Sequence, residues 1–354
     1  MSGPAEQARI PGRAILREVT DAYQTHRATI ADRNTRVLIV RFEPSPGATP
    51  QWASRMHASE VSAQQKTRVF TTLGATVENI VLPDTASASQ LAENLETANT
   101  DPEVAAVIVQ SPPPARLVDQ LDRIRPDKDI DALGVDTTRP ACATADGITR
   151  IAAAYLDATH PDAAGDGHQY TVAVVGSRGF VGSGVVAILQ AQGHPVLELD
   201  AGDELRQVRD VDIVISTTGR AGLLTAEHLH RDHVLVIDSG FIPHPGPIGD
   251  VHPSATHLPR AITPVPGGIG PIEMAVLAER LTIDQAAPGL PHWRYLPPCP
   301  ADPTAPVTTA AHDITRARAA APSTTQLSLV ALTLCADRIL DRPGRRGRPV
   351  RRVR

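Results

Sequence analysis

The sequence predicts an α/β protein of two domains, and three observations carry this prediction. The chain has 354 residues, which is enough for two domains of ordinary size. Strand-like apolar runs alternate with helix-like stretches along most of it, which is typical of parallel sheets covered by helices. Hydrophobic residues make up 42%, charged residues 21% and aromatic residues 3%, so we expect soluble globular domains with aliphatic cores.

The elements of the first half come in the order helix, strand, loop, helix, strand. Apolar residues recur at helical spacing between 11 and 34, and residues 35–43 form the apolar run of a buried strand. Residues 43–56 are rich in proline and predict a loop. Residues 57–74 then predict a helix that ends at Gly74 in a left-handed cap, and a further strand follows.

A third unit of helix and strand begins at about Ser87. Its strand, AAVIVQ, stops at the sequence SPPP, so Gln110 lies at the carboxyl end of a strand. Open α/β sheets bind their ligands at that edge. On the preceding helix, Ser62 and Lys66 are four residues apart and share one face.

The second half has the pattern of a Rossmann-type domain. YTVAVVGSRGFVGSGVVAILQAQGHPVLELD predicts strand, glycine turn, helix and strand, and VDIVISTTG and HVLVIDSG predict two more buried strands. Gly176, Gly179 and Gly182 stand where the first strand passes to the helix. Their backbone can approach a pyrophosphate, and the flanking strand and helix favour this reading over a packing turn.

Asp200 ends the second strand of that unit. At this place a carboxylate accepts hydrogen bonds from ribose hydroxyls and repels the additional phosphate of NADP. The alternative is that Asp200 only caps the loop after it.

Lysine is rare in this chain. Lys66 and Lys128 are the two lysines among 34 basic residues. A buried ammonium, unlike a guanidinium, can lose its proton and serve as an acid or base, so each lysine is a candidate for catalysis. Accidental surface positions are the alternative.

Several classes of partner are not expected. The formal net charge of −5 gives no reason to bind nucleic acid. No apolar run has transmembrane length and the start lacks the apolar segment of a signal peptide, so we expect a cytoplasmic protein without a membrane partner.

No metal site is expected either. The cysteines are too widely scattered to form one, and they are interpreted as reduced packing residues: Cys142, Cys299 and Cys335. The spacing of His228, His230 and His233 fits no zinc pattern, and a solvated helix end is the prediction for them.

The C-terminal part differs in composition. Residues 284–323, rich in Pro and Ala, and 342–354, rich in Arg, predict a flexible tail, and 324–341 predict one helix between them. A solvated tail is favoured over one that binds a polyanion.

Five segments of the sequence resemble the motifs of a known family. ITPVPGGIGPIEMA is similar to TPVPGGVGPMT, the signature of the bifunctional methylenetetrahydrofolate dehydrogenase/methenyltetrahydrofolate cyclohydrolases, the FolD proteins. Four more segments agree in order: VIVQSPPP resembles VQLPLP, PDKDIDALG resembles PxKDVDG, VVGSRGFVG resembles VVGRSxxVG, and VIDSGFI resembles VIDVGIN. The chain is identified as a divergent member, with the resemblance extending from about residue 11 to about 281.

The resemblance implies the domain organisation. A folate-binding catalytic domain would span 10–138, completed by a helix over 271–283 and, optionally, by 324–341. A Rossmann-type NAD(P)-binding domain would span 139–270, with a cleft between the two domains. A homodimer formed through the cofactor domain is also implied.

The resemblance further implies the reaction. The enzyme would oxidise 5,10-methylenetetrahydrofolate with hydride transfer to NADP or NAD, and then hydrolyse the methenyl product to 10-formyltetrahydrofolate. Two alternatives remain: the same fold with an altered substrate in a specialised pathway, and a folate- or nucleotide-binding regulatory protein without turnover.

Three catalytic residues follow from the family's motifs. Lys66 matches the lysine of PASxxYVxxK, eight residues before Gly74, and would exchange protons. Gln110 would position the lysine or the water, and Asp131 would hold the amino-pyrimidine edge of the pterin. Lys128 falls on the lysine of the KDVDG string, as a structural residue or a contact at the rim of the site.

The resemblance also implies the residues of two binding sites. The substrate is expected to contact Ser62, Pro264, Pro266, Gly267, Gly268 and Pro271. The cofactor is expected to contact Gly176, Ser177, Arg178, Gly179, Gly182, Asp200, Thr218, Gly219, Asp238 and Gly240.

The substrate side departs from the family in three places. The family's tyrosine four residues before the lysine is Ser62, which removes an aromatic face worth about 1 kcal/mol of ring packing. A longer loop introduces Trp52, as a substitute ring or as a cover for the core. Glu273 replaces a threonine and would lie near the nicotinamide or point to solvent.

The cofactor side departs as well. The family's Arg-Ser after the first glycine is Ser177-Arg178 here, and its later His-Ser, which helps to hold a 2′-phosphate, is Asp200-Ala201. Both changes favour NAD over NADP, although Arg178 would still be in reach of a phosphate.

Overall fold

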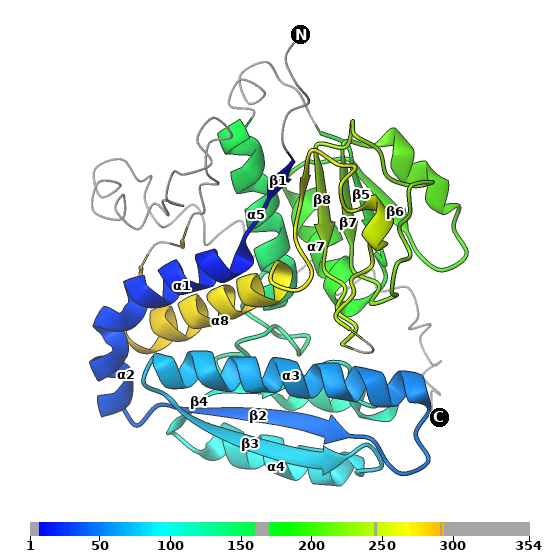
Figure 1. Ribbon diagram of the computed structural model, residues 1–354. Helices are drawn as coiled ribbons and strands as arrows, with labels where there is room; N and C mark the ends of the chain where they lie inside the picture. Colours follow the sequence, from blue (N-terminus) through cyan, green and yellow to red (C-terminus); the bar gives the residue numbers. More distant parts are fainter. Residues whose placement is uncertain (1–6, 160–169, 244–245, 291, 294–354) are drawn as a thin grey trace, which may run out of the picture. The chain divides into compact units, whose positions relative to one another are not determined.

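The computed structural model describes residues 7–159, 170–243, 246–290 and 292–293. These residues form two parallel β-sheets with helices, which confirms the α/β class (Figure 1). The helix predicted over 324–341, the tail predicted over 342–354 and most of the tail predicted over 284–323 lie outside the described residues. Where the structure describes that last segment, the flexible-tail prediction was wrong, because helix α8 (Ile269–Gln285) extends into it and Trp293 is buried. Of the helices that the structure describes, none combines the length and the apolar character needed to cross a membrane.

The smaller sheet consists of three parallel strands in the order β3-β2-β4. Its strands and two main helices are β2 (Arg36–Glu43), α3 (Pro50–Thr72), β3 (Thr76–Pro83), α4 (Ala88–Thr100) and β4 (Val104–Val109). Ile39 of β2 packs in one buried cluster with Phe70 of α3, and Val40 packs in another with Leu91 of α4. Successive strand residues point to opposite faces, so the two helices cover opposite faces of this sheet.

Helix α3 begins earlier than the sequence predicted. Residues 50–56, predicted as loop, are its first turns. The Thr49 side chain caps the helix by accepting a hydrogen bond from the backbone N–H of Trp52 at 3.2 Å. Pro50 occupies the first helical turn, where its missing N–H leaves no hydrogen bond unmade. The other end is as predicted, because Gly74 has a φ of +96°.

The larger sheet consists of six parallel strands in the order β1-β9-β8-β7-β5-β6. They are β1 (Ala8–Arg9), β5 (Val172–Val175), β6 (Val196–Leu199), β7 (Ile213–Ser216), β8 (Leu235–Asp238) and β9 (Ala261–Ile262). Strand β5 lies between β6 and β7, so the strand order reverses beside it. This is the switch point at which open α/β sheets bind ligands, and it confirms the Rossmann-type arrangement.

Strand β1 was not predicted. It is two residues long, too short for a periodic signal, and it pairs with β9 through Ala8 and Ala261. The start of the described chain therefore lies against the strand that leads into the PVPGG sequence.

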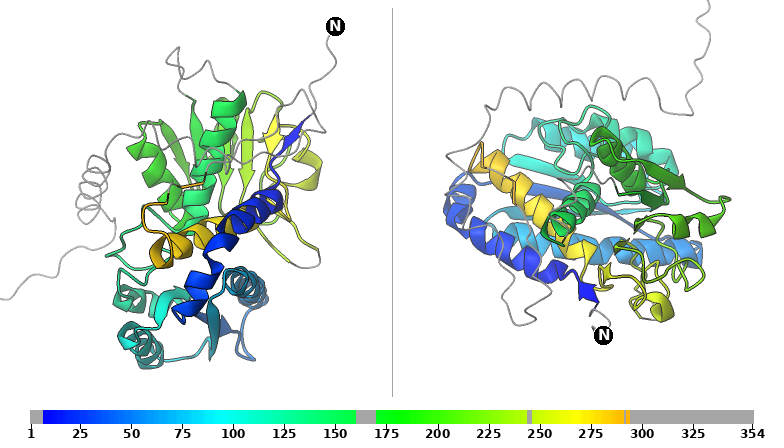
Figure 2. Two further views of the ribbon diagram at one scale, coloured as in Figure 1. Left: turned by 90° about the vertical axis from the view of Figure 1, so that its left-hand side faces the viewer. Right: turned by 90° about the horizontal axis from the view of Figure 1, so that it is seen from above.

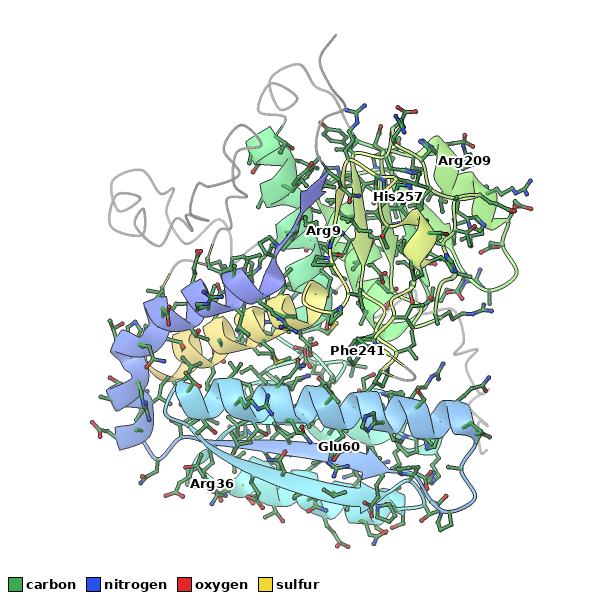
Figure 3. The ribbon with its side chains drawn as sticks, in the orientation of Figure 1. Arg9, Arg36, Glu60, Arg209, Phe241 and His257 are labelled. Carbon is green, nitrogen blue, oxygen red and sulfur yellow. The ribbon has the colours of Figure 1, made fainter. Side chains whose placement is uncertain are left out.

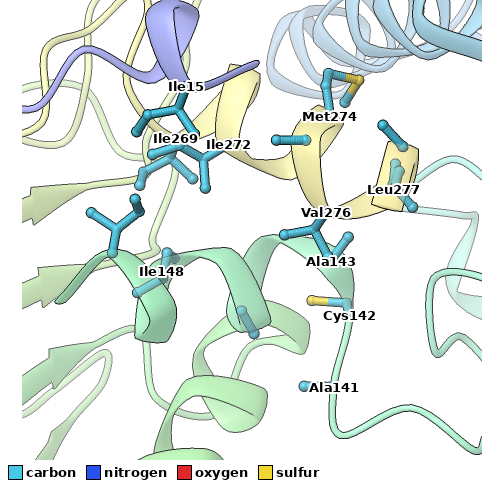
Figure 4. Close-up of a cluster of buried hydrophobic side chains, with 14 of the residues drawn as sticks. Ile15, Ala141, Cys142, Ala143, Ile148, Ile269, Ile272, Met274, Val276 and Leu277 are labelled. Atoms are coloured by element: carbon cyan, nitrogen blue, oxygen red, sulfur yellow. The ribbon is translucent and has the colours of Figure 1, made fainter. Parts of the chain in front are cut away.

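Helix α8 connects the parts of this fold. The remaining helical elements are α1 (Gly12–Tyr23), η1 (Gln24–His26), α2 (Arg27–Asp32), η2 (Ala115–Arg123), α5 (Ala143–Thr159), α7 (Phe180–Ala191), η3 (Leu205–Asp210), η4 (Pro253–Ala255) and α8 (Ile269–Gln285). Helix α8 packs against α1, α5 and α3, and it lies beside α1 in every view (Figures 1 and 2). Ile15, Ile148 and Ile272 from α1, α5 and α8 belong to one buried cluster (Figure 4).

The three histidines are not at a solvated helix end, and that prediction was wrong. Their segment consists of turns, and His233 is fully buried. Its Nε2 lies 2.8 Å from the carbonyl oxygen of Val208, and its ring stacks on His230 with centroids 4.0 Å apart. Both ring nitrogens of His233 thus have backbone partners. In the described part of the chain, no group of three or more His, Cys, Asp or Glu side chains is arranged to hold a metal ion.

Candidate active site

Lys66 is buried at the side of α3 that meets α8. It is 2% exposed, and its Nζ donates three hydrogen bonds. The acceptors are Gln110 Oε1 at 3.1 Å, Ser62 Oγ at 3.0 Å and Glu273 Oε1 at 2.5 Å. These come from three elements: the end of β4, the preceding turn of α3, and the start of α8. The structure therefore brings Lys66, Gln110 and Ser62 together, as the motifs predicted.

Gln110 is held so that its oxygen faces the lysine. Its backbone N–H continues the sheet by donating to the carbonyl of Val40 at 2.8 Å. Its Nε2 donates to the carbonyl of Ser59 at 3.3 Å. Because the amide nitrogen is used on a carbonyl, the amide oxygen is the atom left to accept from Lys66.

Asp131 lies in the same electrostatic environment. It is 8% exposed, and its Oδ1 accepts a hydrogen bond from the backbone N–H of Ala143 at 2.8 Å. Burial raises the pKa of Asp131 to about 6; the positive charge of Lys66 lowers it and the carboxylate of Glu273 raises it further. The three predicted catalytic residues thus form one group of interacting charges and dipoles.

Glu273 is the fourth member of this group, and the sequence did not predict it there. Neither of the two expectations, contact with the nicotinamide or exposure to solvent, describes its ion pair with Lys66. Its side chain is 16% exposed, against 3% for that of Lys66. A signal was present in the chain: a buried lysine needs a counter-ion, and Glu273 is the carboxylate that departs from the family signature beside the PVPGG loop.

Ser59 also faces the site, although it was not singled out. It is 4% exposed and lies one turn before Ser62 on the same face of α3. Its Oγ is buried and has no hydrogen-bond partner among the described residues. A buried hydroxyl without a partner is uncommon in folded proteins.

Trp52 covers the core and does not replace the missing tyrosine. Its Nε1 donates to Asp84 Oδ2 at 2.8 Å, and its ring packs against the cluster that contains Leu38. It stands ten residues before Ser62 on one helix, a separation of about 15 Å along the axis.

The predicted substrate loop leads from β9 to α8 and consists of Pro264, Pro266, Gly267 and Gly268. The backbone N–H of Arg13 at the start of α1 donates to the carbonyl of Gly267 at 3.2 Å. Gly267 has a φ of +107°, which residues with a side chain rarely adopt. Pro271 lies in the first turn of α8, two residues before Glu273. The loop is therefore held next to the Lys66 group.

The glycine turn between β5 and α7 fits a nucleotide phosphate. Gly176 has a φ of +85°, and a Cβ on Gly182 would collide with the carbonyl of Gly176. Gly179 is the N-cap of α7 and supplies no side-chain cap. The N–H groups of the first turn thus stay uncapped, as pyrophosphate binding requires.

Asp200 follows β6 beside this turn. Its Oδ1 accepts from the backbone N–H of Ala201 at 2.7 Å, and its Oδ2 accepts from that of Arg178 at 2.9 Å. These hydrogen bonds, from Ala201 first and then Arg178, lower the pKa of Asp200. Asp200 does cap its own loop, and its ionised carboxylate also fits the ribose contact that the motif predicts. Ser177 is buried, with its N–H donated to the carbonyl of Leu199.

The remaining predicted cofactor residues lie in two loops that aspartates hold. Asp250, which the sequence analysis missed, is fully buried and accepts from the backbone N–H groups of Thr218 and Arg220, both at 2.8 Å, which shapes the turn at Gly219. Asp238 accepts from the N–H groups of Gly240, Asp250 and Val251, each at 2.9 Å. Burial raises the pKa of Asp238 to about 6.

Asp238 therefore has the surroundings of a structural residue. It is 3% exposed, and both of its carboxylate oxygens face backbone N–H groups. This geometry indicates that the Asp238 carboxylate supports the cofactor loops. The predicted contact of Asp238 with the cofactor stays a prediction.

The second lysine, Lys128, is structural. It is 6% exposed, and its Nζ donates to the carbonyls of Ala98 and Asp101, both at 2.6 Å. These carbonyls are at the C-terminal end of α4, where a cation is favourable. Of the two alternatives for this residue, the structural one is confirmed.

Arg280 of α8 holds the chain on both sides of Asp131. It is 2% exposed and donates to the carbonyls of Ile130 and Ala141 and to Asp146 Oδ2, each at 2.9 Å. Asp146 in turn binds Arg150 with both carboxylate oxygens at 2.7 Å. The sequence showed Arg280 only as one arginine of an amphipathic helix.

Two family profiles match this chain. The catalytic domain of tetrahydrofolate dehydrogenase/cyclohydrolase matches residues 12–131, and the NAD(P)-binding domain of the same proteins matches residues 142–287. Bifunctional protein FolD 1 of Streptomyces avermitilis is 33% identical over 228 residues, which cover 60% of this chain and 75% of that protein. Bifunctional protein FolD of Caulobacter vibrioides is 29% identical over 285 residues, which cover 75% and 94%.

Solved structures share the fold. The Trypanosoma brucei N5,N10-methylenetetrahydrofolate dehydrogenase-cyclohydrolase, complexed with NADP and inhibitor, has a TM-score of 0.64 at 21% identity and covers 80% of this chain and 98% of its own. The NAD-dependent 5,10-methylenetetrahydrofolate dehydrogenase of Saccharomyces cerevisiae has a TM-score of 0.58 at 14% identity and covers 78% and 96%.

Proposed function

The chain belongs to the tetrahydrofolate dehydrogenase/cyclohydrolase family, and on this premise we propose that it is an enzyme of one-carbon folate metabolism. It oxidises 5,10-methylenetetrahydrofolate to the methenyl compound with hydride transfer to NAD or NADP, and it hydrolyses that compound to 10-formyltetrahydrofolate. The observation that carries the proposal is the buried Lys66, bonded to Gln110 and next to the PVPGG loop.

Each residue of the site has a task in these reactions. Asp131, when ionised, accepts hydrogen bonds from the amino-pyrimidine edge of the pterin. Gln110 orients Lys66. The glycine turn at Gly176, Gly179 and Gly182 would hold NAD(P), which would supply the hydride acceptor. Hydrolysis requires that water lose a proton and that a ring nitrogen gain one, and Lys66 is the group that exchanges it.

We also propose a role for each of the two domains. Residues 10–138 and α8 hold the folate, and residues 139–270 hold the NAD(P). The protein is a cytoplasmic homodimer with no nucleic-acid partner.

The proposal is tested by initial rates on methylenetetrahydrofolate with NAD and NADP side by side. We expect reduced nicotinamide in an amount equal to the sum of the methenyl and 10-formyl compounds. No reduction of either cofactor would contradict the proposal. Binding of folate and nucleotide without product at high enzyme concentration would instead support a regulatory protein, and indifference to competing folate analogues would support an altered substrate.

Cofactor choice depends on Asp200. Its carboxylate, held ionised at the end of β6, should repel a 2′-phosphate, so we expect kcat/KM to be higher with NAD than with NADP. Asp200→Ser should lower this preference about tenfold, which is about 1.4 kcal/mol of discrimination. Asp210→Ser, which removes an exposed carboxylate at the end of η3, is the matched control. A wild-type preference for NADP would refute the assignment.

A further inference from the structure

We infer that Glu273 is the positioning residue of Lys66: its carboxylate fixes the ammonium in the site and keeps it charged through neutral pH. This inference deepens the proposed function and rests on it for its consequences in catalysis. It gives a role to a carboxylate that neither the motifs nor the comparisons assign.

Glu273 is the charged partner among the hydrogen-bond acceptors of Lys66. Ser62 and Gln110 present neutral oxygens at 3.0 and 3.1 Å, whereas Glu273 presents a carboxylate oxygen at 2.5 Å. Hydrogen bonds between two ionised groups are shorter and stronger than those between neutral groups. Glu273 on α8 is therefore the strongest of the three acceptors that hold the ammonium.

The titratable groups that act on Lys66 come from two other segments. Glu273 is on α8, and Asp131 and Cys142 are in the chain that leads into α5; α3 and the end of β4 contribute the neutral Ser62 and Gln110. Burial raises the pKa of the Cys142 thiol to about 12, so it is neutral at physiological pH. Two carboxylates thus compete with desolvation for the protonation state of the lysine.

Desolvation alone would drive the proton off Lys66. Burial lowers the pKa of its amine, but Glu273 raises it, Asp131 raises it further, and the net direction is upward. Asp131 is the weaker partner, since one of its oxygens is bound to the N–H of Ala143. Removal of the Glu273 charge should therefore lower the pKa of Lys66.

Buried neighbours on α8 fix the backbone at Glu273. Ile272 and Met274 on either side of it are 0% and 1% exposed, and both are anchored in the buried cluster along α8 (Figure 4). The α8 backbone that carries Glu273 is therefore fixed beside α3. A packed core of this kind resists a shift of the helix.

The pairing has two consequences for the reactions. The methenyl compound is cationic, and an unpaired ammonium beside it would repel it, whereas the Lys66–Glu273 pair is neutral as a whole. In hydrolysis the water oxygen bonds to the amidinium carbon and one water proton passes to the neutral Lys66 amine. As the bond between the ring nitrogen and that carbon breaks, the Lys66 ammonium gives a proton to the nitrogen, and the new hydroxyl loses its proton to solvent as it becomes the formyl carbonyl. Only the neutral amine of Lys66 can accept the water proton. Because Glu273 keeps Lys66 charged, the neutral amine forms only at higher pH.

The experiment uses the rarity of lysine in this chain. In full-length protein with ¹³C-labelled lysine, NMR titration of the ε-carbons reports Lys66 and Lys128 alone, and Lys66→Met assigns the two signals. We expect Glu273→Gln to lower the titration midpoint of Lys66 by about one pH unit or more. Lys128, which binds backbone carbonyls, should keep its midpoint, and Glu273→Asp should restore part of the shift.

The kinetic readout is the pH dependence of methenyl hydrolysis. In Glu273→Gln, the pH at which the rate of hydrolysis rises should fall by the same amount as the NMR titration midpoint of Lys66. Glu60→Gln is the control, because Glu60 is a carboxylate of α3 itself that pairs with Arg41 of β2 at 3.8 Å and not with Lys66 (Figure 3). An unchanged Lys66 midpoint in Glu273→Gln overturns the inference. An inactive protein that shows the NMR shift overturns the proposed function alone, so the two failures are distinguishable.

Discussion

Lys66→Met should lower the rate of hydrolysis of 5,10-methenyltetrahydrofolate by about 10²–10⁴-fold, the usual contribution of a positioned acid or base. The methionine fills the space of the lysine stem but exchanges no proton. It also leaves the Glu273 carboxylate without its partner. The measurement is the decay of the methenyl compound at a fixed pH, corrected for its spontaneous hydrolysis.

Lys66→Arg separates charge from proton transfer. Arginine retains a positive donor toward Gln110 and Glu273 but does not deprotonate at any relevant pH. We expect it to be as slow as Lys66→Met. Full hydrolysis by either variant, in protein with a wild-type melting temperature, would refute the assigned role of Lys66.

Arg280→Leu should lower the free energy of unfolding by about 3–5 kcal/mol, because it breaks a buried ion pair and strands its partners. The arginine is 2% exposed, and its loss removes the donors to Ile130, Ala141 and Asp146 together. Urea unfolding of the full chain measures the change. Folate affinity should fall as well, since the chain on both sides of Asp131 loses its support.

Arg206→Leu is the control for this prediction. Its ion pair with Glu227 has side chains that are 66% and 68% exposed, and exposed pairs contribute about 0–1 kcal/mol. An equal loss of unfolding free energy in the two variants would show that the buried contacts of Arg280 stabilise the protein no more than an exposed ion pair does.

Much of the fold could be predicted because its signals are local. Apolar runs marked the strands from β2 to β8 but not the two-residue strands β1 and β9, and Gly74 marked the end of α3. The start of α3 was predicted wrongly because proline serves both loops and first helical turns. The surroundings of His233 were also predicted wrongly, because its acceptor Val208 lies 25 residues away in sequence.

The site divides in the same way. Lys66, Gln110 and Asp131 were found because motifs with short internal spacing carry them, and the spacing of Ser62 and Lys66 on one helix implies their contact. Asp238 was assigned to the cofactor from its motif, whereas the chain folds three backbone N–H groups around its carboxylate. A motif thus located the residue without showing which way its side chain is turned.

Local periodicity and motif spacing were sufficient for the α/β class, the glycine turn and the choice of Lys66 as the candidate catalytic lysine. The charge state of that lysine needed the fold, because its counter-ion Glu273 is 207 residues away and reaches it only through the packing of α8 on α3. Electrostatic energy depends on distance in space and on burial. Neither quantity is encoded in the spacing of residues along the chain.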